Sequence, residues 1–327
     1  MGRGCFKQRI SAVKASCKAC GIEWAVPGEN IMGKRMAANR KRVTEAVVQG
    51  AIRLSGVATI LFVILIFALL LRDGLPVFKY TSVRQFLFGR DWLPLSGIFG
   101  TLPLSLASLM VTAVAGLIAI PLGTAVAVYI AEVAPSRIKE ILKPAVETLA
   151  AIPSVMIGFI GLLILAPFIQ QVFNLPTGLT AFTGAVILAF MALPTVVSIA
   201  EDAITAVPNE YRAASLALGA TRWQTIRQVV VPAAKSGIFA GAMLGIGRVI
   251  GETMAVLMVT GNAAVIPHSL FQPVRTMTAT IAAEMGETVQ YSPHYFSLFA
   301  IGLLLFVITF VINLAADVAL HRTGRNG

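Results

Sequence analysis

Charged residues are scarce in this sequence, and their scarcity excludes a soluble globular protein. Asp, Glu, Lys and Arg together make up 13% of the 327 residues, whereas apolar residues make up 57%. Soluble domains carry about 25% charged residues, so this chain has too few to cover a surface that faces water. The composition therefore indicates an integral membrane protein.

Motifs for catalysis, metal binding and nucleotide binding are also missing. No G-x-x-x-x-G-K-[ST] loop is present, so we do not expect the chain to hydrolyse ATP. Cys17 and Cys20 have the spacing of half a zinc site, but no second pair follows, and His268, His294 and His321 lie far away in the sequence. We expect no catalytic residue, no metal, no cofactor and no enzymatic activity.

Long uncharged runs are the dominant feature of what the sequence does contain. About 20 apolar residues are needed for a helix to cross a bilayer, and these runs are too long for the short alternating strands of a barrel. The sequence predicts an all-α integral membrane protein with six transmembrane helices. The expected spans are Leu54–Leu71, Pro103–Ile130, Ser154–Gln171, Thr180–Ala200, Gly237–Thr260 and Tyr295–Leu320.

The net charge of +11 is explained by where the basic residues lie, and it does not indicate nucleic-acid binding. Basic residues gather before the first span, in the second–third and fourth–fifth connections, and after the last span. The alternate connections, residues 168–179 and 261–294, contain Arg275 as their only Lys or Arg residue. The exception is the first external connection, which contains Arg72, Lys79, Arg84 and Arg90. Because cytoplasmic segments are enriched in Lys and Arg, we expect a multi-pass protein of the cell (inner) membrane with both termini in the cytoplasm.

The chain divides into five parts on composition. We expect a basic cytoplasmic tail without fixed structure, followed by one transmembrane domain that includes a polar loop. Met32 and Met36 within the tail are alternative starts of translation. The boundaries are 1–50 for the tail, 51–72 for the first transmembrane helix, 73–100 for an external loop, 101–322 for the main transmembrane domain with its coupling loop 201–235, and 323–327 for a cytoplasmic tail.

The polar loop 201–235 predicts a short helical elbow. Residues from Asn209 to Ala217 favour a helix, Gly219 is a natural terminator, and Thr221 can cap a second helix that runs from Arg222 and is ended by Pro232. Trp223 lies on this second helix. An exposed aromatic residue flanked by arginines is suited to enter a groove on another protein, although a solvated loop is the alternative.

The fifth span contains two charges within an apolar helix. Arg248 and Glu252 are four residues apart, which places them on one face where they can pair. Charges inside a span mark a functional path by default, and a purely structural ion pair is the alternative. The small residues Gly245, Gly247 and Gly251 predict close packing of this span against a neighbour.

Several other charges carry weaker signals. We expect Glu284 and Glu287, in the fifth–sixth external connection, to be solvated, and Asp317 to reach the membrane interface at the end of the last span. The charges around the second–third connection cannot be ranked from the sequence; they are Glu132, Arg137, Lys139, Glu140 and Glu147.

The polar loop contains a motif that resembles the EAA loop of ABC importer permeases. The motif is Ala213-Ala214-Ser215, three residues, Gly219, nine residues, and then Val229-x-Val231-Pro232. The resemblance implies a MetI-like bundle with a cytoplasmic coupling helix that contacts a separate ATPase. Coupling would then be carried by Ala213, Ala214, Gly219, Arg222, Trp223 and Pro232. The family usually has glutamate where this chain has Ala213, so the usual carboxylate is absent.

The block from Gly247 to Val256 resembles phosphate importer permeases of the PstC type, as do Ala151–Val155 and Thr260–Asn262. The resemblance implies a phosphate path formed by Arg248, Glu252 and Thr253. It also implies a PstA-like second permease, PstB-like ATPase subunits that bind ATP, a PstS-like external phosphate-binding protein and surrounding membrane lipid.

Two other functions remain open at this point. A permease for another oxyanion, such as molybdate or sulfate, differs from a phosphate permease only in cargo. A self-standing channel or ion-coupled carrier would work without an ATPase subunit, and such carriers usually contain an internal repeat, which this sequence lacks.

Overall fold

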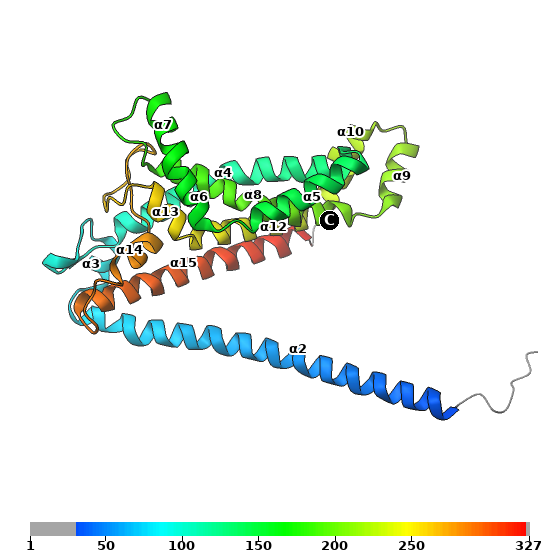
Figure 1. Cartoon of the computed structure of the whole chain (residues 1–327), viewed down its shortest axis with the longest axis horizontal. Helices are drawn as coiled ribbons and strands as arrows, with labels where there is room; N and C mark the ends of the chain where they lie inside the picture. The colour runs from blue at the N-terminus through cyan, green and yellow to red at the C-terminus, as the bar shows by residue number, and fades with distance from the viewer. Residues whose placement is uncertain (1–30, 325–327) are drawn as a thin grey trace, which may run out of the picture. The chain divides into compact units, whose positions relative to one another are not determined.

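The computed structural model describes residues 31–324, and describes side chains from residue 48 to residue 318. The chain divides into two compact units, Met1–Leu65 and Ile66–Gly327. In chain order the elements (Figure 1) are α2 (Ile31–Gly74), η1 (Leu75–Lys79), α3 (Val83–Phe88), β1 (Trp92–Leu93), η2 (Pro94–Ser96), β2 (Ile98–Phe99), α4 (Leu102–Val128), η3 (Tyr129–Val133), α5 (Ser136–Ala150), α6 (Ser154–Ile160), η4 (Gly161–Leu165), α7 (Ala166–Val172), α8 (Ala181–Thr205), α9 (Asn209–Ala217), α10 (Arg222–Thr225), η5 (Ile226–Val230), α11 (Val231–Ala233), α12 (Lys235–Gly251), α13 (Met254–Val259), α14 (Met277–Glu284) and α15 (Pro293–Gly324).

The all-helical membrane fold is confirmed. Five helical segments in the described part of the chain are long and apolar enough to cross a membrane, and the count reaches six if a bent pair forms one span. The five segments are Val48–Lys79, Leu102–Val133, Ser154–Val172, Ala181–Thr205 and Pro293–Val318. The bent pair joins Arg222–Ala233 to Lys235–Gly251 at an angle of 67°. The two short strands pair with each other as an antiparallel hairpin, Trp92 opposite Phe99.

The first unit contains the beginning of α2. This helix starts at Ile31, well before the expected start of a span at residue 51, so residues 31–50 of the expected tail are helical. Residues 1–30, including the Cys17 and Cys20 pair, lie outside the described part of the chain.

The second unit is built around α8. In the most apolar part of α8 61% of residues are buried, compared with 17% for α15. Its small side chains, among them Ala185 and Ala192, pack against Val111 and Ala115 of α4. On another side α8 packs against α12, and Figure 1 shows α4, α8 and α12 running together through the bundle. The helix that precedes the elbow is thus the most deeply buried one.

Three glycines bring α12 close to α8. Gly237, Gly241 and Gly245 are spaced four residues apart, which places them on one face. A Cβ atom added at Gly237 would lie 2.3 Å from the Cβ of Ala203, and one added at Gly245 would lie 2.6 Å from Cγ2 of Val196. Transmembrane helices use such small residues to let their backbones approach.

The expected close packing at Gly245 is confirmed, whereas Gly247 and Gly251 pack against no other part of the described chain. A Cβ atom at Gly247 or Gly251 would meet no atom within 4 Å. Gly247 is two residues from Gly245, so it faces away from α8, and Gly251 is the last residue of α12. The stripe that packs against α8 also includes Gly237 and Gly241, which precede Gly245 at intervals of four residues.

Replacing Gly245 with leucine should destabilise the protein, because the new side chain overlaps Val196 in a packed core. We expect a loss of about 1–3 kcal/mol, which is typical of overpacking. Gly247→Leu is the matched control, since it makes the same change within the same helix at an exposed position. Thermal unfolding of the purified proteins in detergent measures both, and equal midpoints for the two variants would contradict the packing.

Candidate functional site

The polar loop forms a helical elbow, residues 209–233, that projects at one end of the bundle (Figure 1). Its first arm, α9, ends in a turn where Gly219 has a φ of +86°. In that turn the N–H of Ala220 donates to the carbonyl of Ser215 at 3.2 Å. Thr221 and Gln224 then form a reciprocal capping box at the start of α10. The predicted helix, turn and second helix are confirmed.

The second arm differs from the expectation at its end. Pro232 was expected to end the helix, but the chain stays helical through the π-helical segment η5 and through α11 to Ala233. Pro232 lies in the first turn of α11, where a missing N–H is tolerated. The two arms are joined by a hydrogen bond of 2.9 Å between the hydroxyls of Ser215 and Thr225.

The elbow exposes several large apolar side chains. Trp223 is 63% exposed and Leu218 is 90% exposed, and Tyr211 and Leu216 add to the same patch. The residues expected to take part in coupling are all exposed as well: Ala213, Ala214, Gly219, Arg222, Trp223 and Pro232. Apolar side chains that gather on a polar segment mark an interaction site.

Arg212 fixes the base of the elbow. Its Nε and Nη2 atoms donate to one carboxylate oxygen of Glu132 at 3.1 and 2.6 Å. Nη2 also donates to the carbonyl of Ile204 at 3.0 Å, and Nη1 donates to the carbonyl of Val207. The Arg212 guanidinium therefore binds one carbonyl in the last turn of α8 and one just beyond it, and it ties α9 to η3. From the sequence, Arg212 counts among the basic residues of the fourth–fifth connection and Glu132 among the unranked charges of the second–third connection, because nothing in the sequence links residues so far apart.

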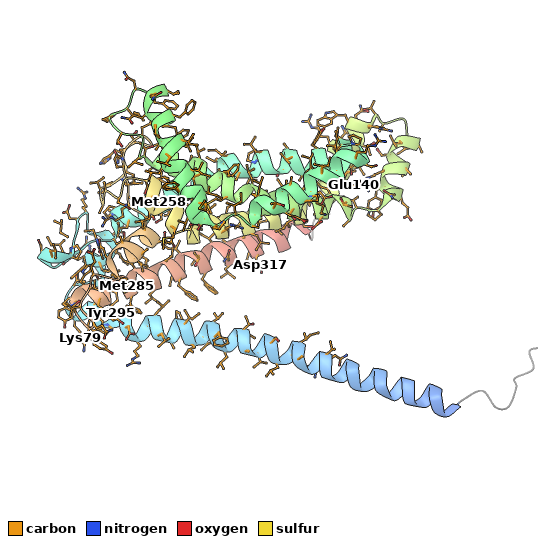
Figure 2. The ribbon with its side chains drawn as sticks, viewed as in Figure 1. Lys79, Glu140, Met258, Met285, Tyr295 and Asp317 are labelled. Carbon is orange, nitrogen blue, oxygen red and sulfur yellow. The ribbon has the colours of Figure 1, made fainter. Side chains whose placement is uncertain are left out.

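A second charged cluster holds α5 against α8. Glu201 is only 2% exposed, and it accepts hydrogen bonds from Lys139 at 3.1 Å, Lys143 at 2.7 Å and the hydroxyl of Thr205 at 3.0 Å. Lys143 also binds Asp202 at 2.8 Å. Hydrogen bonds to Asp202 and Glu201 raise the pKa of Lys143, which lies outside the spans, above its ordinary value. The amine therefore keeps its charge at neutral pH. Figure 2 shows Glu140 of the same helix at this end of the bundle.

The second polar region is a break in the expected fifth span. The helix α12 ends at Gly251, Glu252 is extended with a ψ of 133°, and α13 begins at Met254. One carboxylate oxygen of Glu252 accepts from the N–H groups of Met254 at 3.1 Å and Ala255 at 3.2 Å. The Glu252 side chain thus caps α13 from within its own chain.

The expected pair between Arg248 and Glu252 was wrong, since no ion pair joins them within the described residues. Their spacing of four residues places side chains together only in a continuous helix, and the backbone leaves the helix at Glu252. Arg248 is instead exposed in the last turn of α12. Next to the break, the Thr253 hydroxyl donates to the carbonyl of Gly251 at 3.2 Å.

A third cluster surrounds Glu284, which was expected to be solvated. Its side chain is 15% exposed, because three donors from different segments converge on it. Arg275 binds it at 2.6 Å, His294 at 2.8 Å, and Trp92 donates to both of its oxygens at 3.1 and 3.2 Å. Glu287 is exposed, as expected. Figure 2 labels Met285, which follows Glu284 in the sequence, and Tyr295, which follows His294, at one end of the second unit.

Comparison with known proteins shows that the chain is similar to inner-membrane components of transport systems. Residues 119–325 match a family described as "Binding-protein-dependent transport system inner membrane component". A probable ABC transporter permease protein, YqgH of Bacillus subtilis, is 42% identical over 245 residues, which cover 74% of this chain and 79% of YqgH. The phosphate transport system permease protein PstC of Mesorhizobium japonicum is 39% identical over 257 residues, 73% of this chain and 78% of that protein.

Solved structures support the fold. A bacterial alginate ABC transporter, in complex with an alginate pentasaccharide-bound periplasmic protein, has a TM-score of 0.59 at 15% identity, covering 88% of this chain and 96% of that one. An inward-facing MetNI methionine ABC transporter has a TM-score of 0.53 at 19% identity, covering 66% and 93%. At these identities the likeness establishes the architecture.

Replacing Arg212 with methionine should loosen the elbow, because the carbonyl of Val207 and the carboxylate of Glu132 lose their donor. Such unsatisfied groups cost about 1–3 kcal/mol. We therefore expect amide hydrogen exchange in α9 to be at least about tenfold faster. The control is Arg222→Met, an exposed residue on the other arm. If exchange in α9 is the same in both variants, Arg212 does not hold the elbow.

Proposed function

The chain belongs to the family of binding-protein-dependent transport system inner membrane components, and we propose that it is the permease subunit of an ATP-driven phosphate importer. It is a multi-pass membrane transport subunit and not an enzyme. The choice of phosphate is supported by the 39% identity to a phosphate transport system permease protein. Another such protein, from Haemophilus influenzae, is 34% identical over 281 residues.

The observation that carries the proposal is an exposed arginine beside a break in a transmembrane segment. Arg248 lies in the last turn of α12, and Glu252 and Thr253 form the break that follows. A charge in a span is costly, so it is retained where it faces a bundle interior or a path for ions. We assign Arg248, Glu252 and Thr253 to the substrate path.

The chemistry of arginine suits phosphate as the cargo. Its planar guanidinium is permanently charged and donates paired hydrogen bonds to a tetrahedral oxyanion. Because the Glu252 carboxylate is engaged with the N–H groups of α13, it does not compete with an anion for the Arg248 guanidinium. The arrangement thus leaves one cation available at the break.

The elbow is the proposed contact with a separate ATP-hydrolysing subunit. The proposal is supported by the exposure of Trp223 and Leu218, and by the absence of a phosphate-binding loop from the sequence. Since Ala213 offers no carboxylate, apolar contacts from these two side chains supply the affinity. Ala214, Gly219, Arg222 and Pro232 shape and surround this surface.

The assembly needs further subunits. We propose a PstA-like second permease that completes the path, PstB-like subunits that bind ATP, and a PstS-like binding protein that delivers phosphate from outside. This chain binds no cofactor of its own in that arrangement. The excess of Lys and Arg in α5 and the elbow supports a cytoplasmic position for this end of the bundle and for both termini.

Uptake into vesicles tests the function directly. The complete importer should take up labelled phosphate only with ATP inside, the ATPase subunit present and the binding protein outside. Preferential uptake of molybdate or sulfate would replace phosphate as the cargo. Uptake that continues without the ATPase subunit would instead establish a channel or an ion-coupled carrier.

Replacing Arg248 with lysine keeps the charge but removes the paired donors, so phosphate uptake should fall by about tenfold, equivalent to one good hydrogen bond to a charged group. Arg84→Lys, an exposed position in α3, is the matched control and should keep full uptake. Full uptake by the Arg248→Lys protein would rule out paired recognition of the oxyanion.

Replacing Trp223 with alanine should weaken binding of the ATPase subunit, because buried aromatic anchors contribute about 2 kcal/mol or more at protein interfaces. We expect about thirtyfold weaker association, measured by titrating the purified ATPase subunit onto the permease in detergent. Phe88→Ala removes an aromatic side chain of similar exposure, 66%, from α3 and should have no effect. Unchanged affinity after loss of Trp223 would place the contact elsewhere.

A further inference from the structure

The break at Glu252 leaves a backbone carbonyl without its helical partner. In a continuous helix this oxygen would accept from the N–H four residues later, at Val256. Because Glu252 is extended, its carbonyl accepts instead from the hydroxyl of Thr278, at 2.8 Å. Thr278 is only 8% exposed, so water does not readily replace this donor.

Thr278 belongs to α14, and α14 is fixed at both ends. At its start the N–H of Met277 donates to the hydroxyl of Ser108 in α4 at 2.9 Å. Thr276 caps the helix by accepting from the N–H of Ala279. At its end lies Glu284, which is held by Trp92, Arg275 and His294. The donor is therefore presented to the break by a helix that cannot easily shift.

We propose that Thr278 is a positioning residue that holds the fifth span broken at Glu252. A continuous helix would give this carbonyl oxygen the N–H of Val256 as its donor, and in the broken helix the hydroxyl of Thr278 takes that place. The hydroxyl favours the broken arrangement, which sets the orientation of the Glu252 carboxylate and of Thr253 beside Arg248. The short helix α14 thus links the Glu284 cluster to the break.

The role in transport rests on the proposed function, whereas the role in holding the break does not. Thr278→Val keeps the shape of the side chain but removes the donor, and Thr278→Ser keeps the donor. Thr280→Val is the matched control. Thr280 is fully buried in the same helix, but its hydroxyl donates at 2.8 Å to the carbonyl of Thr276 within α14.

Two measurements follow for the wild type and the three variants. The first is amide hydrogen exchange in the segment from Glu252 to Val256 of the purified chain. The second is phosphate uptake by the complete importer in vesicles, with the half-saturating phosphate concentration and the maximal rate determined separately. In Thr278→Val we expect exchange to change by about tenfold and the maximal rate to fall by about tenfold, as for loss of one hydrogen bond to a buried group. In Thr278→Ser and Thr280→Val both readouts should stay within about twofold of the wild type.

Equal exchange in Thr278→Val and Thr280→Val would overturn the positioning role. Changed exchange with unchanged uptake would also overturn the link between the break and transport. If the wild-type importer takes up no phosphate, the proposed function fails, and exchange alone then decides whether Thr278 holds the break.

Discussion

Backbone polar groups that are shielded from water have to find their partners within the protein, and the helix ends and the break of this chain follow from that constraint. Where the helices are regular, the backbone satisfies itself and the side chains are apolar. Where a helix ends or breaks, a particular side chain takes over. Arg212 donates to the carbonyl of Ile204 at the end of α8, Glu252 accepts from the N–H groups at the start of α13, and Thr278 donates to the carbonyl at the break. The polar residues that distinguish this protein stand at those points.

The same constraint explains how packed helices connect the elbow with the path that we propose. The glycine stripe of α12 keeps this helix close to α8, and two charged clusters, around Glu201 and Arg212, fix α5 and α9 to the end of α8. A force applied to the elbow therefore reaches a closely packed pair of helices, one of which leads directly to Arg248. Packed side chains and ion-pair networks can carry coupling between distant sites, and here the contacts are glycine packing and partly buried ion pairs.

Local patterns predicted much of this structure. The apolar runs predicted five of the six expected spans, whereas the fifth, Gly237–Thr260, is broken at Glu252. Gly219 and Thr221 predicted the elbow, because caps and turns are determined by neighbours in the sequence. Two of the errors share one cause. The pairing of Arg248 with Glu252 assumed a regular helix, and the solvation of Glu284 assumed a loop without partners. The break depends on Thr278, and the burial of Glu284 depends on residues from other segments, so no local pattern contains either.

The central claim is that this chain works as one half of a path driven by an ATPase that binds at the elbow. An electron cryomicroscopy map of the chain purified from its native membrane together with its bound partners tests the claim most directly. The account predicts a second, different permease beside the break at Glu252, and density of an ATP-binding subunit that covers Trp223 and Leu218. A map that shows the chain alone or only with copies of itself, with both elbow side chains uncovered, would contradict it.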